Sequence, residues 1–374
     1  MKKFLKLNIS VFDKILMHKS ADQGIIANTY LHILSTADTN FLENYNLSKK
    51  GKIWASIRSK LVLIVRAFQF IFNGKYYCTQ QKNVKSDVLF VSHLTNKQQV
   101  LKDGDAYFGD LPNQLLLNGI SSSVVLMNHA KVNKRQMFDG WNGSEIPRFV
   151  LFSSLGFLSE IRLYLAQRKS EQQLKYILKN LKIDKTLVEE ILYNHFSSST
   201  FEALRVAKQV ANIANSTNAK FIVTTYEGHA WECLVYYYAR KFNPDIKCFG
   251  YQHSAVFEHQ YAIKRPLGNK YDPDVILTSG LLSQVIFKRI QSIKSNVVCL
   301  GSPQHNPSEI LLNKAQCCLV VPRAEVAECL TLFEFSLTYA KQHQENKFIW
   351  RLHPLVSFDN LKKHSAIFNN LPDN

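Results

Sequence analysis

Short runs of apolar residues, each ending in small or polar residues, begin at about residue 87 and recur along the chain. The first run covers 87–93, and another covers 123–127. Runs of this length are typical of strands that are buried on both faces of a parallel sheet. A helix is predicted between them at 111–118. A strand, a helix and a strand at this spacing predict a βαβ unit.

The spacing of apolar residues becomes mostly helical over 155–218, and strands and helices then alternate again. Further strands are predicted at 220–225, 246–250, 275–278, 297–300, 317–321 and 347–351. Further helices are predicted at 230–241, 281–293, 325–343 and 359–369. The pattern favours the α/β class, with two doubly wound, Rossmann-like domains that meet near residue 303. Such a domain needs about five or six strands. We therefore expect the second domain, with only two, to be incomplete at its C-terminal end.

Residues 1–86 show no alternating strand pattern and predict a mainly helical N-terminal region. Residues 87–302 then form the first Rossmann-like domain, with a helical insertion, and residues 303–374 form the partial second one. The most apolar stretch, 53–77, is interrupted by Arg66, whereas a membrane-spanning helix needs about 20 mostly apolar residues. The stretch favours a buried helix, with a basic amphipathic helix on a membrane surface as the alternative.

The amino-acid composition and net charge exclude several classes of protein. The 374 residues are 46% hydrophobic and 20% charged, which excludes a largely disordered or fibrous chain. The net charge of +17 suits nucleic acid, an anionic membrane surface or phosphorylated small molecules. Nucleic acid is not expected, because the basic residues are dispersed and no RRM, KH or zinc-finger signature occurs. Seven cysteines without a C-x-x-C pair, and no secretory signal pattern, indicate a reducing, cytoplasmic location and no structural zinc.

Ligands of doubly wound sheets bind beyond the carboxyl ends of the strands, so polar residues at those positions are candidates. Glu227 directly follows a predicted strand and can act as a general base, or as an ordinary first-turn residue favoured by the helix dipole. His253 follows the next strand and can move a proton near neutral pH, or bond to nearby backbone. Other residues expected to line this cleft are Asp110, His229, Gln252, Ser254, Ser279, Gly280 and Ser302.

Arg351 and His353 end the last predicted strand and, two residues apart, point to one side of an extended segment. Such a pair suits the phosphates of a nucleotide, although an ordinary strand-end arginine before a packed Pro354 fits the same pattern. The histidines lack a metal-ligand spacing, so no metal site is expected. The sequence also lacks the glycine-rich phosphate and dinucleotide motifs and the G-x-S-x-G elbow of hydrolases.

Taken in order, these elements resemble the GT-B glycosyltransferase superfamily, and within it a group of bacterial surface-carbohydrate biosynthesis proteins. The resemblance extends from about Asp87 to the end of the sequence. The motifs that carry it are FGDLP at 108–112, YEGHAWE at 226–232, GYQHS at 250–254, PD at 273–274, LGS at 300–302 and IWRLHP at 349–354. One departure occurs at Arg323-Ala324, where the resemblance leads us to expect a Glu-Gly pair.

The resemblance implies transfer of a sugar from a nucleotide-activated donor to a lipid-linked or glycan acceptor of O-antigen lipopolysaccharide or capsule. The first domain would hold the acceptor and the second the donor. Glu227 would be the base, His253 would lie near the reacting centre, and Arg351 and His353 would contact the donor phosphates. It implies no metal and no cofactor, and the acceptor suggests attachment to the inner face of the cytoplasmic membrane.

Two other functions fit the same sequence. One is a polyol-phosphate transferase of the CDP-glycerol type, which also uses cytidine nucleotides and cleft histidines. The other is a non-catalytic, truncated remnant or a scaffold in glycan assembly, which the end of the sequence at Asn374 favours.

Overall fold

The computed structural model describes residues 2–32, 61, 65, 76–80, 84–152, 154–181, 183–257, 260–303, 317–322, 325–352, 356–369 and 371. Most of the apolar stretch 53–77 lies outside these residues. Two compact units make up the chain, Met1–Asn306 and Pro307–Asn374. Within the described residues, no helix is both long and apolar enough to cross a bilayer.

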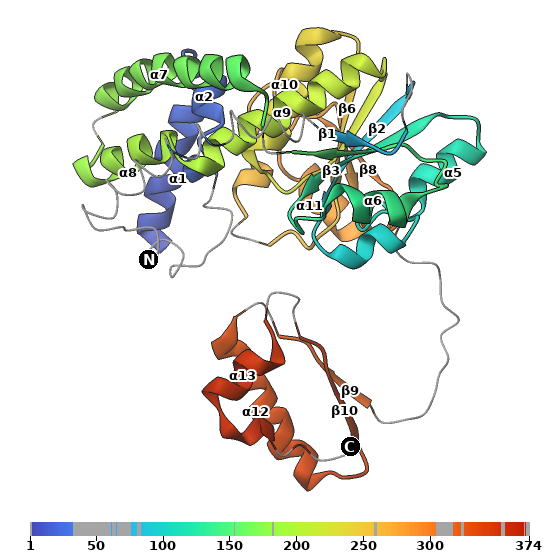
Figure 1. Cartoon of the computed structure of the whole chain (residues 1–374). Coiled ribbons are helices and arrows are strands. Elements are labelled where there is room, and N and C mark those ends of the chain that lie inside the picture. Colours follow the sequence, from blue (N-terminus) through green and yellow to red (C-terminus); the bar gives the residue numbers. More distant parts are fainter. Residues whose placement is uncertain are drawn as a thin grey trace. The chain divides into compact units, whose positions relative to one another are not determined.

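The first unit is built on one large sheet (Figure 1). Its strands are β1 (Tyr76–Cys78), β2 (Val88–Leu94), β3 (Ser122–Asn128), β4 (Arg148–Leu151), β5 (Phe221–Thr225), β6 (Lys247–Gln252), β7 (Val275–Thr278) and β8 (Asn296–Cys299). The order across the sheet is β1-β4-β3-β2-β5-β6-β7-β8. Among the described strands, only β1 pairs antiparallel, with β4. From β2 the chain winds to one edge, then returns to β5 and winds to the other, which is the doubly wound order.

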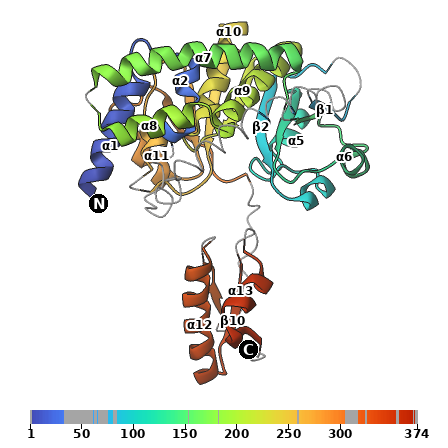
Figure 2. The ribbon, with the colours of Figure 1, turned by 60° about the vertical axis from the view of Figure 1, so that its left-hand side comes forward.

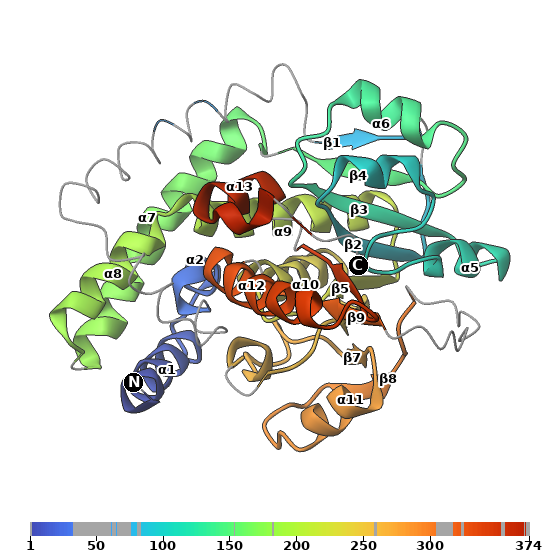
Figure 3. The ribbon, with the colours of Figure 1, turned by 90° about the horizontal axis from the view of Figure 1, so that it is seen from below.

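Helices cover both faces of this sheet (Figures 1 and 3). On one face lie α5 (Leu111–Leu117) and α6 (Lys134–Trp141). The other face carries α1 (Lys2–Leu16), α2 (Gln23–Ile26), α7 (Phe157–Asn180), α8 (Lys185–His195), α9 (Ser198–Ser216), α10 (Ala230–Phe242) and α11 (Leu281–Lys288). Successive strand residues face opposite sides. Phe90 therefore packs in the core beside α6, and its neighbour Leu89 packs in the core beside α10.

Most elements agree with the sequence pattern to within one or two residues at each end, and three differ from it. The prediction that 1–85 holds no strand is wrong at β1, an edge strand of three residues that is too short to show alternation. Strand β4 was not predicted because only four residues separate Pro147 from Phe152. The helix predicted at 281–293 ends at Lys288, and the backbone turns at Arg289 and Ile290 instead.

The helical insertion forms three helices, α7 to α9, that join β4 to β5. Asp184 begins α8 by accepting hydrogen bonds from two backbone N–H groups, and Ser197 begins α9 by accepting one from the N–H of Thr200. Helix α7 packs against α2 (Figure 2). A buried ion pair joins α7 to α9: the Arg205 guanidinium donates to both carboxylate oxygens of Glu160, at 2.8 to 3.0 Å. The side chains are 1% and 3% exposed.

The second unit contains β9 (Cys317–Val320), α12 (Val326–Gln342), β10 (Lys347–Trp350), α13 (Phe358–His364) and the short 3-10 helix η5 (Ala366–Asn369). Its two strands pair in parallel. Phe333 of α12 stacks on Trp350, with ring centroids 4.5 Å apart, at the centre of a small core. Leu319 and Phe335 remain 56% and 70% exposed. Parallel sheets are usually covered on both faces, whereas this unit leaves these two apolar side chains exposed.

Replacing Arg205 by methionine tests the buried ion pair. Arg205→Met leaves the Glu160 carboxylate buried without its charge partner, and breaking a buried pair costs about 3–5 kcal/mol. Urea denaturation should show a loss of that size. Lys220→Met is the control, because Lys220 pairs with Asp87 at 2.7 Å but is 70% exposed, and such surface pairs contribute about 0–1 kcal/mol. Equal losses in the two variants would contradict a structural role for the buried pair.

Candidate functional site

The candidate site lies at the carboxyl ends of β2 and β5, the neighbouring strands at which the winding of the sheet reverses. In doubly wound sheets, the loops after two such strands run in opposite directions, and ligands generally bind at this point. The ring of His93, on β2, lies with Nε2 3.2 Å from the hydroxyl of Thr225 on β5. Its Nδ1 lies 3.0 Å from Nε2 of His129, which follows β3. Side chains from three strands therefore meet here.

Glu227 lies in the loop between β5 and α10 and contacts three polar side chains. Its Oε2 lies 3.1 Å from His229 Nε2. Its Oε1 lies 3.3 Å from His253 Nε2 and accepts a hydrogen bond of 3.3 Å from the Ser254 hydroxyl. The structure thus brings one carboxylate between two imidazoles, one from its own loop and one from the loop after β6.

The conformation of this loop is set by a buried carboxylate. Glu232, on the first turn of α10, accepts hydrogen bonds of 2.9 Å from the backbone N–H groups of Glu227, Gly228 and His229. Gly228 has a φ of +87°, and a Cβ there would lie 2.3 Å from the backbone nitrogen of Ile263. Glycine is therefore required at 228, both for its φ and for the close approach of the Ala262 and Ile263 backbone.

Aromatic rings line the same strand ends. The Tyr107 ring lies edge-on to His253, with centroids 4.7 Å apart, and 5.4 Å from His93. The Trp231 ring lies edge-on to His93 at 5.6 Å. The loop with Tyr107 is held by Asp105, whose carboxylate accepts from the N–H of Tyr107 and from the Ser92 hydroxyl, both at 2.8 Å. Tyr107, His93 and Trp231 are all partly exposed.

Burial and neighbouring charges shift the pKa values of Glu227 and of the three histidines in different directions. The hydrogen bond from His229 is the main reason that the pKa of Glu227 falls to about 2, although burial opposes the shift. Burial lowers the pKa of His229, but its bond to Glu227 and the charges of Glu232 and Glu227 outweigh burial, so this pKa is raised. Burial lowers the pKa of His93 to about 3 and also lowers that of His253. At pH 7 Glu227 is ionised, and His93 and His253 are neutral.

Other predicted cleft residues lie at neighbouring strand ends without reaching Glu227. The Gln252 carbonyl accepts a 3.0 Å bond from the N–H of Ser279, and Gly280 precedes α11. The Gln252 side-chain amide is buried, and neither polar atom has a partner among the described residues. The hydroxyl of Ser302 bonds to Tyr251. Asp110 is exposed at the start of α5, where it accepts from the Asn113 amide, and no described contact joins it to Glu227.

The predicted phosphate residues belong to the second unit. Arg351 directly follows β10, its side chain is exposed, and its backbone N–H donates to the Val320 carbonyl at 3.0 Å. His353 lies outside the described residues, and so does the pair Arg323-Ala324, which stands where the GT-B resemblance leads us to expect Glu-Gly.

Tyr107, Thr225 and His129 were not among the candidates, and His93 appeared only as part of a strand end. The strand-end rule finds Thr225 and His129 once β3 and β5 are placed, because His129 follows the last residue of β3 by one position. Nothing in the sequence indicates Tyr107, since its position depends on the turn that Asp105 holds. Among the described residues, no group of three or more histidines, cysteines or carboxylates is arranged to hold a metal ion.

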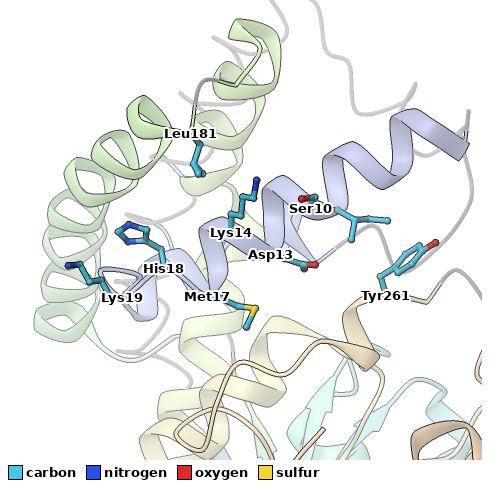
Figure 4. A pocket seen from close by; sticks show the side chains of 9 residues that line it. Ser10, Asp13, Lys14, Met17, His18, Lys19, Leu181 and Tyr261 are labelled. Atoms are coloured by element: carbon cyan, nitrogen blue, oxygen red, sulfur yellow. The ribbon is translucent and has the colours of Figure 1, made fainter. Parts of the chain in front are cut away.

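A cavity of about 790 Å³ lies elsewhere, beside α1 (Figure 4). It is lined by Ile9, Ser10, Asp13, Lys14, Met17, His18, Lys19, Leu181 and Tyr261. It shares no lining residue with the strand-end site, but one of its residues supports that site indirectly. Asp13 accepts a 2.5 Å bond from Arg265, which also donates to the Leu31 carbonyl. The N-terminal helices are thereby joined to the segment that packs under Gly228.

Replacing Glu227 by glutamine tests the electrostatics of the site. Glu227→Gln keeps the shape but removes the negative charge that helps to raise the pKa of His229, so that pKa should fall below its value in the unaltered chain. Imidazole NMR titration measures it. In both proteins His93 should stay neutral between pH 5 and 8, because its pKa is about 3. Glu345→Gln, at an exposed position in the second unit, is the control and should leave His229 unchanged. An unaltered His229 titration in Glu227→Gln would contradict the pairing.

Comparison with known proteins adds little to this geometry. No family model matches the chain, and no curated protein matches it. A solved structure described as "Crystal Structure of CalG4, the Calicheamicin Glycosyltransferase" aligns with a TM-score of 0.33 and 11% sequence identity. The alignment covers 77% of this chain and 69% of that chain. A structural similarity at this TM-score supports no conclusion about function, so the proposed function rests on the geometry of the site.

Proposed function

We propose that this protein is a glycosyltransferase of the GT-B type that transfers a sugar from a nucleotide-activated donor to a bacterial surface polysaccharide, O-antigen lipopolysaccharide or capsule. One observation carries the proposal. A carboxylate flanked by two imidazoles, Glu227 with His229 and His253, lies beside the ends of β2 and β5. Ligands of doubly wound sheets bind at this reversal point, and such groups can move the proton of a hydroxyl.

The reaction needs a proton acceptor. An acceptor hydroxyl forms the new bond to the anomeric carbon and loses its proton, while the nucleoside diphosphate leaves with the electron pair of the bond that breaks. Glu227 is the proposed base and is ionised throughout the physiological range. A base with so low a pKa is weak, but the bond from His229 is the main cause of that value. We propose that the acceptor hydroxyl replaces His229 as the hydrogen-bond donor to Oε2. The main cause of the low pKa is then absent, and Glu227 is a stronger base. His253 stays at Oε1 and orients the carboxylate.

The donor side of the proposal belongs to the second unit. Arg351 and His353 are the proposed contacts to the donor phosphates, because a guanidinium matches two phosphate oxygens at once. We propose that this unit is part of a larger donor domain, which its exposed Leu319 and Phe335 support. The net charge of +17 supports attachment to the anionic inner face of the cytoplasmic membrane, where a lipid-linked acceptor would be found.

Loss of the Glu227 carboxylate should reduce sugar transfer. Glu227→Gln keeps the hydrogen-bonding shape but cannot accept the proton, so transfer from nucleotide sugars to lipid-linked glycan acceptors should fall about 10²–10⁴-fold. Nucleotide binding should be retained, because the change is confined to the proton acceptor. Glu345→Gln should transfer at the rate of the unaltered chain. Near-normal turnover in Glu227→Gln would remove Glu227 from the mechanism.

Arg351→Met should weaken nucleotide binding. A charge-assisted hydrogen bond contributes about 1.5–3 kcal/mol, so calorimetric titration of cytidine, uridine and guanosine diphosphates should show a loss of about tenfold or more. Lys347→Met, at the opposite end of the same strand and also exposed, is the control and should bind normally. Nucleotide binding that does not depend on Arg351 would show that this residue does not contact the phosphates.

A further inference from the structure

The N-terminal half of helix α7 buries polar side chains and leaves apolar ones exposed. Its buried residues include Glu160 and Gln167. Leu158, Ile161 and Leu165 are 65%, 42% and 60% exposed, and they lie three and four residues apart, so they form one apolar stripe along the helix. In a helix that only covers a core, the apolar side faces inward. Exposed apolar residues grouped on one surface are typical of an interaction site.

Buried hydrogen bonds hold α7 in this orientation. The Glu160 carboxylate accepts from the Arg205 guanidinium, and both side chains are buried. The Gln167 amide donates to the carbonyls of Gly24 and His195, at 3.1 and 3.0 Å. A rotation of α7 that buried the apolar stripe would break these bonds and leave a buried carboxylate without its charge partner, which is strongly destabilising. The exposure of the stripe is therefore a fixed feature of the fold.

The charged residues on the exposed side of α7 are all basic. They are Arg162, Arg168, Lys169, Lys175 and Lys179. Glu160 is buried, and the only other acidic residue of the helix, Glu171, is 17% exposed and pairs with Arg168 and Lys175 at 3.1 and 2.7 Å. Apolar side chains beside lysine and arginine suit an anionic lipid surface, because the apolar groups enter the acyl region and the cations meet the lipid phosphates.

A second copy of the chain fits this surface less well. It would bring two sets of exposed cations together, and like charges repel. The net charge of +17 likewise favours an anionic partner.

The position of α7 in the fold agrees with a membrane-facing role. Figures 1 and 2 show α7 along the outer edge of the first unit. The helix begins shortly after the carboxyl end of β4. Because β4 runs parallel to β3, this end lies at the same edge of the sheet as the candidate site. Contact with a membrane at the start of α7 therefore suits a substrate that is linked to lipid.

We infer that the exposed side of α7 is the surface by which this protein binds an anionic lipid membrane. Leu158, Ile161 and Leu165 insert between the lipids, and Arg162 and Lys169 contact the lipid phosphates. The inference rests on the membrane attachment in the proposed function and assigns that attachment to one helix. Lysine and arginine side chains are long enough to keep their charges at the headgroups while the apolar stripe is buried.

The experiment is a titration of the full chain with vesicles of phosphatidylcholine alone, and of equal parts phosphatidylcholine and phosphatidylglycerol. We expect binding to the anionic vesicles only, and weaker binding at high salt, because salt screens the charges. The double variant Ile161→Gln/Leu165→Gln should bind at least tenfold more weakly. Leu117→Gln is its control, because Leu117 is 86% exposed on α5, and should bind as the unaltered chain does.

A second pair of variants tests the cations. Arg162→Gln/Lys169→Gln should bind anionic vesicles about tenfold more weakly, because each cation close to an anionic leaflet contributes to binding. Arg135→Gln/Lys347→Gln removes the same charge at exposed positions outside α7 and is the control. All the altered side chains are exposed, so the variants should fold, and the unfolding midpoint of each is measured first.

The inference is overturned if the chain does not bind anionic vesicles, binds neutral ones as well, or loses equal affinity in the control variants. It is also overturned if Ile161→Gln/Leu165→Gln abolishes a dimer in analytical ultracentrifugation and leaves vesicle binding unchanged. Vesicle binding through α7 without transfer from any nucleotide sugar supports the inference and contradicts the proposed function. Sugar transfer by a chain that does not bind anionic vesicles retains glycosyl transfer and contradicts the inference.

Discussion

The geometry of the candidate site depends on one buried carboxylate. Glu232 accepts hydrogen bonds from the backbone N–H groups of residues 227–229 and so holds the loop before α10 in the conformation that places the Glu227 and His229 side chains side by side. Burial raises the pKa of Glu232 to about 8, while these N–H groups favour the ionised form. The loop cannot relax away, because the Ile263 backbone packs directly against Gly228. Arg265 in turn donates hydrogen bonds to the Asp13 carboxylate and the Leu31 carbonyl, so the N-terminal helices are joined to the segment that packs against Gly228.

The reversal of winding at β2 and β5 explains why polar side chains from separate parts of the sequence meet at this position. His93 and Thr225 are 132 residues apart in sequence, yet they are in contact because their strands are neighbours. His253 joins them because β6 is the next strand in the sheet. The topology therefore brings together groups from separate halves of the unit.

The sequence was sufficient to predict the parallel strands and the placement of Glu227 and His253 at one edge, because both follow from the rule that carboxyl ends of parallel strands lie together. It could not predict β1 and β4, whose short lengths show no periodicity. Nor could it predict the contact of Tyr107 with His253, which depends on a turn held by Asp105. The low pKa of Glu227 could not be predicted from the sequence either, because it depends on a 3.1 Å contact with His229.

The distance in sequence between the two central strands has a consequence for how this protein is made. On the ribosome, β2 emerges long before its neighbour β5, and the helical insertion α7 to α9 emerges between them. The entropic cost of closing this large loop grows only slowly with its length, but long-range strand pairing slows folding. Until β5 arrives, one side of β2 has no partner, and its unpaired N–H and C=O groups are open to wrong pairing. The centre of the sheet, where the candidate site lies, is thus open to aggregation in the nascent chain until β5 is made.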